Sequence, residues 1–271
     1  MSEAVSAPAP LPLACSLEGP RGAPVLVLGN SLGTSGPVWE RQVPALASRF
    51  RLLRYELPGH GGSASADGPY TISRLGAGVL KLLDQYEIEH AAYCGISLGG
   101  MVGMWLAACS PDRIDALGLV CTSAYLPPAS SWLARAEQVR VAGMASILEQ
   151  MLGRWFIPAF AAREPDVTGA FGADLERTDP AGYAACCEAI AAMDLRPVLG
   201  SVTAPTLVIS AAEDPATPPA HGALIAKEIA GARLRVIRRT AHLATVGAPG
   251  EVTAALLDHL VRTSGRQQRL D

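Results

Sequence analysis

The chain alternates between short, strand-like runs and segments with helical periodicity. The strand-like runs cover residues 25–28, 51–57, 91–94, 116–121, 206–211 and 234–237, and most of them are continuously apolar. The helical patterns cover residues 39–48, 71–86, 98–108, 219–229 and 251–262. Continuous apolar runs are typical of strands that are covered on both faces. The alternation therefore predicts an α/β protein with a mostly parallel, doubly wound sheet and right-handed crossovers.

One long segment breaks this alternation. Residues 125–196 are rich in Ala, Arg, Met and Glu and have helical patterns throughout, and strand-like sequence resumes only at Thr206. Turn signals divide the segment into three or four short helices, at Gly143, Pro158, Pro165 and Pro180. We therefore expect a core formed by residues 1–124 and 197–271, with a helical cap at 125–196 inserted after the fifth or sixth strand.

Composition excludes several classes of protein. Of the 271 residues, 49% are hydrophobic and 17% charged, and the net charge is −3. Such a chain can bury a core, and it offers no basic surface for nucleic acid or an anionic membrane. The uncharged stretch 91–110 is interrupted by a glycine-rich turn, so no membrane span is expected. The six scattered cysteines lack zinc-ligand spacing, which predicts no metal and reduced thiols in the cytoplasm.

The pattern Gly-x-Ser-x-Gly occurs twice, at 29–33 and 95–99. In a nucleophile elbow, a strand precedes the serine and a helix follows it, so that the sharp turn exposes the hydroxyl. Ser97 meets both conditions, whereas Ser31 is followed by a loop. Ser97 is therefore the predicted nucleophile. The loop at 29–33 is expected to supply the backbone N–H of Leu32, which would form an oxyanion hole with that of Leu98; whether Ser31 adds its N–H stays open.

A serine nucleophile needs a general base, and the chain has five histidines. Only His242 lies on a loop just after a late strand. His259 is expected at the surface of the last helix, and His60 in a structural turn. The acid should follow a strand between Ser97 and His242, and the strand at 206–211 leads into Glu213 and Asp214. The Asp-Pro turn favours Asp214 over Glu213.

In this order, Ser97, Asp214 and His242 resemble the residues of an α/β-hydrolase. More specifically, the chain resembles the 3-oxoadipate enol-lactone hydrolases. The matching segments span most of the chain, cap included: GNSLGT at 29–34, GISLGGM at 95–101, WLAR at 132–135, RWFIP at 154–158, GYAACC at 182–187 and DPATP at 214–218.

The resemblance implies hydrolysis of 3-oxoadipate enol-lactone to 3-oxoadipate in aromatic catabolism, without a metal or organic cofactor. The free carboxylate of that substrate suits an arginine. Arg135 is the first candidate, with Arg140 and Arg154 as alternatives and Trp132 and Trp155 as apolar walls.

Other functions share these features. The alternatives are a carboxylesterase or another lactonase, a cofactor-free perhydrolase, and a non-catalytic ligand receptor on the same scaffold. Each would take a small molecule as its partner. A homo-oligomer is compatible with the sequence, which does not specify an assembly.

Overall fold

The computed structural model describes residues 10–267 and contains one seven-stranded sheet. The first nine residues, which fall within the expected core range, lie outside the described part. The strands run in the order β1-β3-β2-β4-β5-β6-β7, and every pairing is parallel except that of β1 with β3. Their bounds are β1 Cys15–Glu18, β2 Val25–Gly29, β3 Arg51–Tyr55, β4 Ala91–Ile96, β5 Ile114–Val120, β6 Thr206–Ala211 and β7 Arg233–Ile237.

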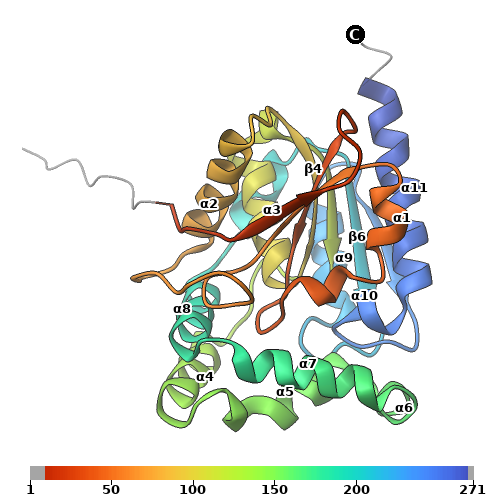
Figure 1. Ribbon diagram of the computed structural model, residues 1–271. Coiled ribbons are helices and arrows are strands. Elements are labelled where there is room, and N and C mark those ends of the chain that lie inside the picture. Colours follow the sequence, from red (N-terminus) through yellow and green to blue (C-terminus); the bar gives the residue numbers. More distant parts are fainter. Residues whose placement is uncertain (1–9, 268–271) are drawn as a thin grey trace, which may run out of the picture.

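Helices cover both faces of this sheet, which confirms the predicted doubly wound α/β class. Helices α2 (Ile72–Gln85) and α3 (Leu98–Cys109) lie on one face, and α1 (Val43–Ala47) and α11 (Pro249–Gln267) on the other (Figure 1). Helix α9 (Pro219–Glu228) contacts β6 and β7, and α10 (Ala244–Gly247) precedes α11. The central strands β4 and β6 are buried along their whole length, as their continuous apolar sequences predict.

Two of the expected elements differ from the structure. The helix expected at 39–48 is instead a short 3₁₀ helix, Gly36–Trp39, followed by α1, because residues 40–42 form a turn in which the N–H of Gln42 donates to the carbonyl of Trp39 at 2.8 Å. The antiparallel edge strand β1 was missed because it is only four residues long and is largely half-buried, so it lacks a continuous apolar run.

The segment between β5 and β6 is helical, and the insertion follows the fifth strand. It contains five α-helices rather than three or four: α4 Ala129–Ala142, α5 Leu148–Trp155, α6 Pro158–Arg163, α7 Pro165–Arg177 and α8 Pro180–Ala191. Three of them begin at the predicted prolines, and α4 ends before Gly143, whose φ is +74°. We refer to α4–α8 as the cap; Figure 1 shows it at one end of the sheet.

All six cysteines are free thiols. Across the described residues, the helices are either too short or too polar to cross a bilayer.

Candidate active site

Ser97 occupies a strained turn between β4 and α3. Its φ of 55° and ψ of −117° lie in a region that non-glycine residues seldom adopt. Two glycines make the turn possible, since a Cβ at Gly95 would collide with the Gly99 backbone and one at Gly99 with the Gly29 backbone. The carbonyl of Ser97 accepts a hydrogen bond from the Thr122 hydroxyl at 2.6 Å. The turn is therefore fixed from the strand, the helix and the neighbouring loop.

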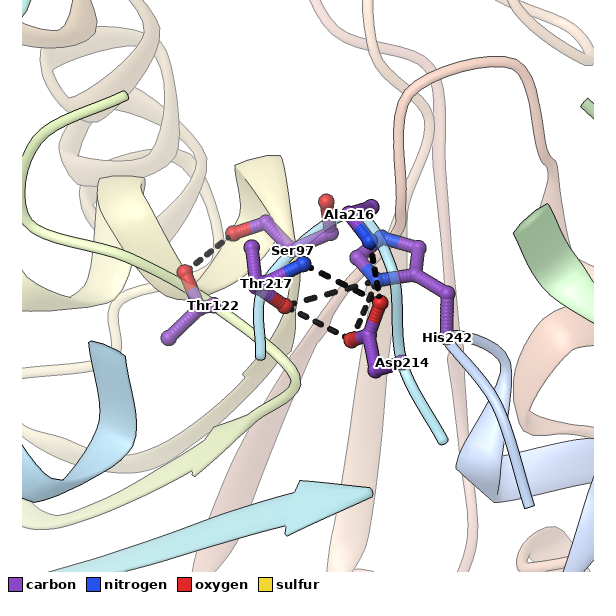
Figure 2. Close-up of polar contacts among 6 residues, drawn as sticks. All are labelled: Ser97, Thr122, Asp214, Ala216, Thr217 and His242. Atoms are coloured by element: carbon purple, nitrogen blue, oxygen red, sulfur yellow. Dashed lines mark hydrogen bonds and ion pairs between the residues drawn. The ribbon is translucent and has the colours of Figure 1, made fainter. Parts of the chain in front are cut away.

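Asp214 lies in the loop after β6, where it binds the imidazole of His242. Its Oδ2 accepts a hydrogen bond from Nδ1 of His242 at 2.8 Å, and both side chains are buried. The Thr217 hydroxyl also donates to Oδ2, at 2.7 Å, while the N–H groups of Ala216 and Thr217 donate to Oδ1 at 2.8 and 3.0 Å. Figure 2 shows these groups beside Ser97.

These contacts determine the charge of Asp214. Burial alone would raise the pKa of its carboxyl, but the His242 ring and the donors of Thr217 outweigh burial and hold the pKa below its usual value. The carboxylate is therefore ionised at neutral pH, and the proton on the ring is directed to Nδ1. The other ring nitrogen, Nε2, then carries no proton and can accept one. This is the arrangement that a hydroxyl nucleophile needs in order to lose its proton.

Glu213, the rejected alternative, does not bind His242. Its Oε2 accepts the backbone N–H of Thr240 at 3.0 Å, so it braces the loop before the histidine. The structure thus brings Ser97, Asp214 and His242 together and places Glu213 outside that group.

A single pocket joins Ser97 and His242 to the cap. Its lining also includes Ser31 and Leu32 from the loop after β2, and Trp132, Arg135, Arg154 and Trp155 from the cap. Leu98 is buried directly after Ser97, at the first position of α3. No hydrogen bond among the described residues uses the N–H of Leu32 or Leu98, so both donors remain available to a bound group.

Two arginines of the cap lie close together in this pocket without an acidic partner. Neither Arg135 nor Arg154 forms an ion pair within the described part of the chain. Arg135 lies over the Trp132 ring, 4.6 Å from its centroid, and its charge acts on the nearby Tyr183 hydroxyl. Burial and then repulsion by Arg135 lower the pKa of Arg154. The pair is therefore a ready site for an anion.

The third candidate, Arg140, lies away from the pocket lining. It pairs with Glu188 at 2.6 Å on an exposed part of the cap. Sequence reasoning had no means of separating the three arginines, and it missed Thr217 and Thr122 as partners of the site.

The remaining histidines have other contacts. His259 is buried, not exposed as expected, because it bonds to the carbonyls of Leu117 and Pro205 beneath the sheet. His90 is exposed and bonds to Asp115, and His221 bonds to Ser123. His60 lies in the predicted turn and is fully buried.

Comparisons with known proteins agree with this architecture. The profile of the alpha/beta hydrolase fold family matches residues 24–249. The 3-oxoadipate enol-lactonase 2 of Acinetobacter baylyi is 37% identical over 231 residues, which are 85% of this chain and 86% of that protein.

Two solved structures are also similar. The enol-lactonase of Burkholderia xenovorans LB400 superposes with a TM-score of 0.90 at 40% identity, over 92% of this chain and 96% of that one. A hydrolase of Pseudomonas aeruginosa PA01 gives 0.89 at 44% identity, over 92% and 94%. With its sheet, its cap and its sequence all in agreement, the chain belongs to the alpha/beta hydrolase family and is similar to 3-oxoadipate enol-lactonases.

Proposed function

We propose that this protein hydrolyses 3-oxoadipate enol-lactone to 3-oxoadipate through an acyl-enzyme on Ser97. The proposal rests on one observation, which is that a nucleophile with its base and a pair of arginines line the same pocket. Ser97 and His242 line one part of it, and the unpaired Arg135 and Arg154 line another. A neutral ester would give these arginines no counter-charge, whereas a lactone that bears a carboxylate would.

The reaction begins with proton transfer from the Ser97 hydroxyl to His242, as the oxygen attacks the lactone carbonyl. Asp214 holds the ring in the required tautomer and stabilises the imidazolium that forms. The developing oxyanion accepts hydrogen bonds from the backbone N–H groups of Leu32 and Leu98. The first donor comes from the loop after β2, and the second opens α3, where the helix dipole also favours negative charge.

Collapse of the tetrahedral intermediate then breaks the bond between the carbonyl carbon and the ring oxygen. The ring oxygen takes the proton from the His242 imidazolium and stays attached to the acyl group as an enol. The enol becomes a ketone, so ring closure is disfavoured. Water, deprotonated by His242, attacks the acyl-enzyme, and the Ser97 oxygen leaves with the proton held by the imidazolium. Every step uses side chains or backbone groups of this chain, and none is routed through a metal or an organic cofactor.

Recognition of the substrate is assigned to the cap. Arg135 and Arg154 bind the free carboxylate, while Trp132 and Trp155 flank the ring as apolar walls. Arg135 is already oriented by its contact with the Trp132 ring, so less side-chain freedom is lost on binding.

We propose that the protein acts in the cytoplasm, because its six free cysteines fit a reducing compartment. We propose the aromatic catabolism that supplies such lactones as its metabolic role.

A direct assay tests the proposal. Purified protein should turn over the carboxylate-bearing enol-lactone with a kcat/KM at least about 100-fold above that for p-nitrophenyl acetate, because each charged contact contributes roughly 1.5–3 kcal/mol. A preference for the neutral ester would indicate a carboxylesterase. Activity that requires peroxide would indicate a perhydrolase, and binding without turnover would indicate a receptor.

A further inference from the structure

His60 is a fully buried histidine that the proposed reaction does not use. It lies in the turn that follows β3, and it is absent from the lining of the pocket. The ring nevertheless contacts the cap. One face of the imidazole stacks on the ring of Tyr183 in α8, with 6.3 Å between the ring centroids.

Both ring nitrogens of His60 have a backbone partner. Nε2 lies 2.9 Å from the N–H of Gly33, and Nδ1 lies 2.9 Å from the carbonyl of Pro58. A carbonyl can only accept and an N–H can only donate, so the proton is on Nδ1 and Nε2 is a bare acceptor. The two contacts therefore select the neutral ring and one of its tautomers.

The Nε2 contact holds the residue next to the proposed oxyanion donor. Gly33 follows Leu32 and has a φ of +79°, and a Cβ there would collide with Leu175 and press on Tyr183 and Trp155 of the cap. Gly33 is thus held between the His60 ring from the core and three cap side chains. The Leu32 N–H belongs to the preceding peptide, so a shift of Gly33 reaches that N–H through the Cα of Leu32.

The rest of this loop, residues 30–36, is held by two carboxylates at its ends. Glu56 accepts the side-chain N–H of Asn30 at 2.9 Å and the backbone N–H of Gly36 at 3.0 Å. Asp174 of α7 accepts the N–H and hydroxyl of Ser35 at 2.9 and 2.7 Å. Neither of them reaches the middle of the loop. There His60 accepts the Gly33 N–H, and the N–H and hydroxyl of Thr34 donate to the Ser31 carbonyl at 3.1 and 3.0 Å.

We propose that His60 is a positioning residue for catalysis, which fixes the loop so that the Leu32 N–H points at the oxyanion. This inference rests on the proposed function for the role of Leu32. It extends that function because His60 touches neither the substrate nor Ser97 and acts through the Gly33 peptide alone.

The electrostatic surroundings support this role. Burial lowers the pKa of His60 to about 4, although the carbonyl of Pro58 and the carboxylates of Asp174 and Asp179 act in the opposite direction. At neutral pH the ring is therefore uncharged, and Nε2 is free to accept.

Two amide substitutions of equal polarity separate the two contacts of the ring. The amide of His60→Gln reaches the place of Nε2 and can accept the Gly33 N–H. The amide of His60→Asn is one methylene shorter and reaches only the place of Nδ1, beside Pro58. We expect kcat to fall about 10- to 100-fold in the Asn variant and to stay within about threefold in the Gln variant, because a shift of ~1 Å in a catalytic group can cost ~100-fold. His90→Gln, at the exposed His90, is the matched control and should leave kcat unchanged.

Inhibitors distinguish positioning from a general structural role. Phenylboronic acid forms a tetrahedral adduct on a reactive serine and places an oxygen in the oxyanion hole, whereas adipate resembles the product and makes no such adduct. The Asn variant should lose affinity for the boronate in proportion to its kcat/KM and keep its affinity for adipate. Equal kcat values for the two variants, or parallel losses of both inhibitors, would overturn the proposal.

A measurement on the unmodified protein covers the case in which the Asn variant fails to fold. In ¹⁵N-histidine NMR spectra at pH 7, His60 should carry its proton on Nδ1 alone and stay uncharged down to about pH 5. A charged ring at pH 6, or the opposite tautomer, would overturn the proposal. All variants are assayed with both p-nitrophenyl acetate and the lactone, so that the proposed substrate and the role of His60 are tested separately. If the wild-type enzyme does not hydrolyse the lactone, the proposed substrate is wrong, but the effect of the His60 variants can still be measured with the ester.

Discussion

The backbone N–H of His242 donates a hydrogen bond to the carbonyl of Arg154, across 3.3 Å. The next residue, Leu243, donates in the same way to the carbonyl of Trp155 at 3.2 Å. These two carbonyls lie at the end of α5, where a helix has no internal donors left to satisfy them. The residues whose side chains face the proposed substrate therefore also hold the loop of the proposed base.

The two serine motifs give the first prediction. Ser97→Ala should reduce hydrolysis of any ester or lactone to background, because the attacking oxygen is removed, while the melting temperature changes little. Ser31→Ala should retain substantial activity, because the backbone N–H groups of that loop survive loss of the side chain. Steady-state kinetics with a thermal melt for each variant provide the check. An inactive Ser31→Ala with an active Ser97→Ala would reverse the assignment of the nucleophile.

The role proposed for Asp214, as the acid that orients His242, is tested by a matched pair of amide substitutions. Asp214→Asn should lower kcat by about 10⁴, because an amide can no longer hold the imidazole in the correct tautomer. Glu213→Gln keeps an oxygen that can accept the Thr240 N–H, and it should cost less than about tenfold. Comparable losses of kcat in both variants would contradict the assignment of Asp214 as the residue that orients His242.

The anion site is tested by the ratio of two substrates. Arg135→Gln and Arg154→Gln should each lower kcat/KM for the carboxylate-bearing lactone by about 10- to 150-fold, which corresponds to ~1.5–3 kcal/mol for a charge-assisted contact. Hydrolysis of p-nitrophenyl acetate should barely change, since Ser97 and His242 are untouched.

The control for this pair is Arg140→Gln, which breaks the exposed pair with Glu188 and should alter neither substrate. A parallel fall on both substrates in the Arg135 or Arg154 variant would show a structural role for that arginine. For Arg154 this outcome has a specific cause, namely displacement of the carbonyl that holds His242.

The buried histidines make stability depend on pH. The pKa of His60 is lowered to about 4, so the folded state favours the neutral ring while the unfolded chain binds a proton near pH 6.5. The stabilisation from the neutral ring is complete above pH 6.5 and falls as the pH drops towards 4. At pH 5 the loss from His60 alone should be about 2 kcal/mol relative to pH 7.5.

Urea denaturation at the two pH values measures this loss. Burial also lowers the pKa of His221 and His259, which act in the same direction. His60→Gln should therefore reduce the pH dependence without abolishing it. An unchanged dependence in this variant would show that His60 is already protonated in the folded protein at pH 5.

The sequence predicted those parts of the molecule that depend on local pattern. The short, mostly apolar runs predicted six strands that all pair in parallel with a neighbour, with ends shifted by at most two residues. The Gly-x-Ser-x-Gly pattern at 95–99 predicted a sharp turn, and no side chain fits at Gly95 or Gly99 in that turn. The group of Ser97, Asp214 and His242 followed from chain order and from strand ends, and the structure brings these residues together.

Features that depend on tertiary packing were not predictable in this way. His259 follows a surface-like helical pattern, but its ring forms hydrogen bonds with the carbonyls of Leu117 in β5 and of Pro205 just before β6, which are buried partners. Arg140 and Arg154 belong to similar helical sequences, and only the arrangement of α4, α5 and α8 shows that one is paired with Glu188 and the other faces the pocket. The contact between Gly33 and His60 joins two turns that are 27 residues apart, and neither turn contains a signal for the other.

The hydrogen bonds from the His242 loop to α5 also bear on how such enzymes can diversify. A helical insert that only covered a pocket could be replaced by one of a different shape without affecting the catalytic residues. Each replacement would then change the substrate specificity. Here a replacement would also have to present two free carbonyls at the same place, or the histidine would lose its support. Engineering of new substrate preferences in this protein should therefore change side chains along α4 and α5 and leave the backbone at the end of α5 where it is.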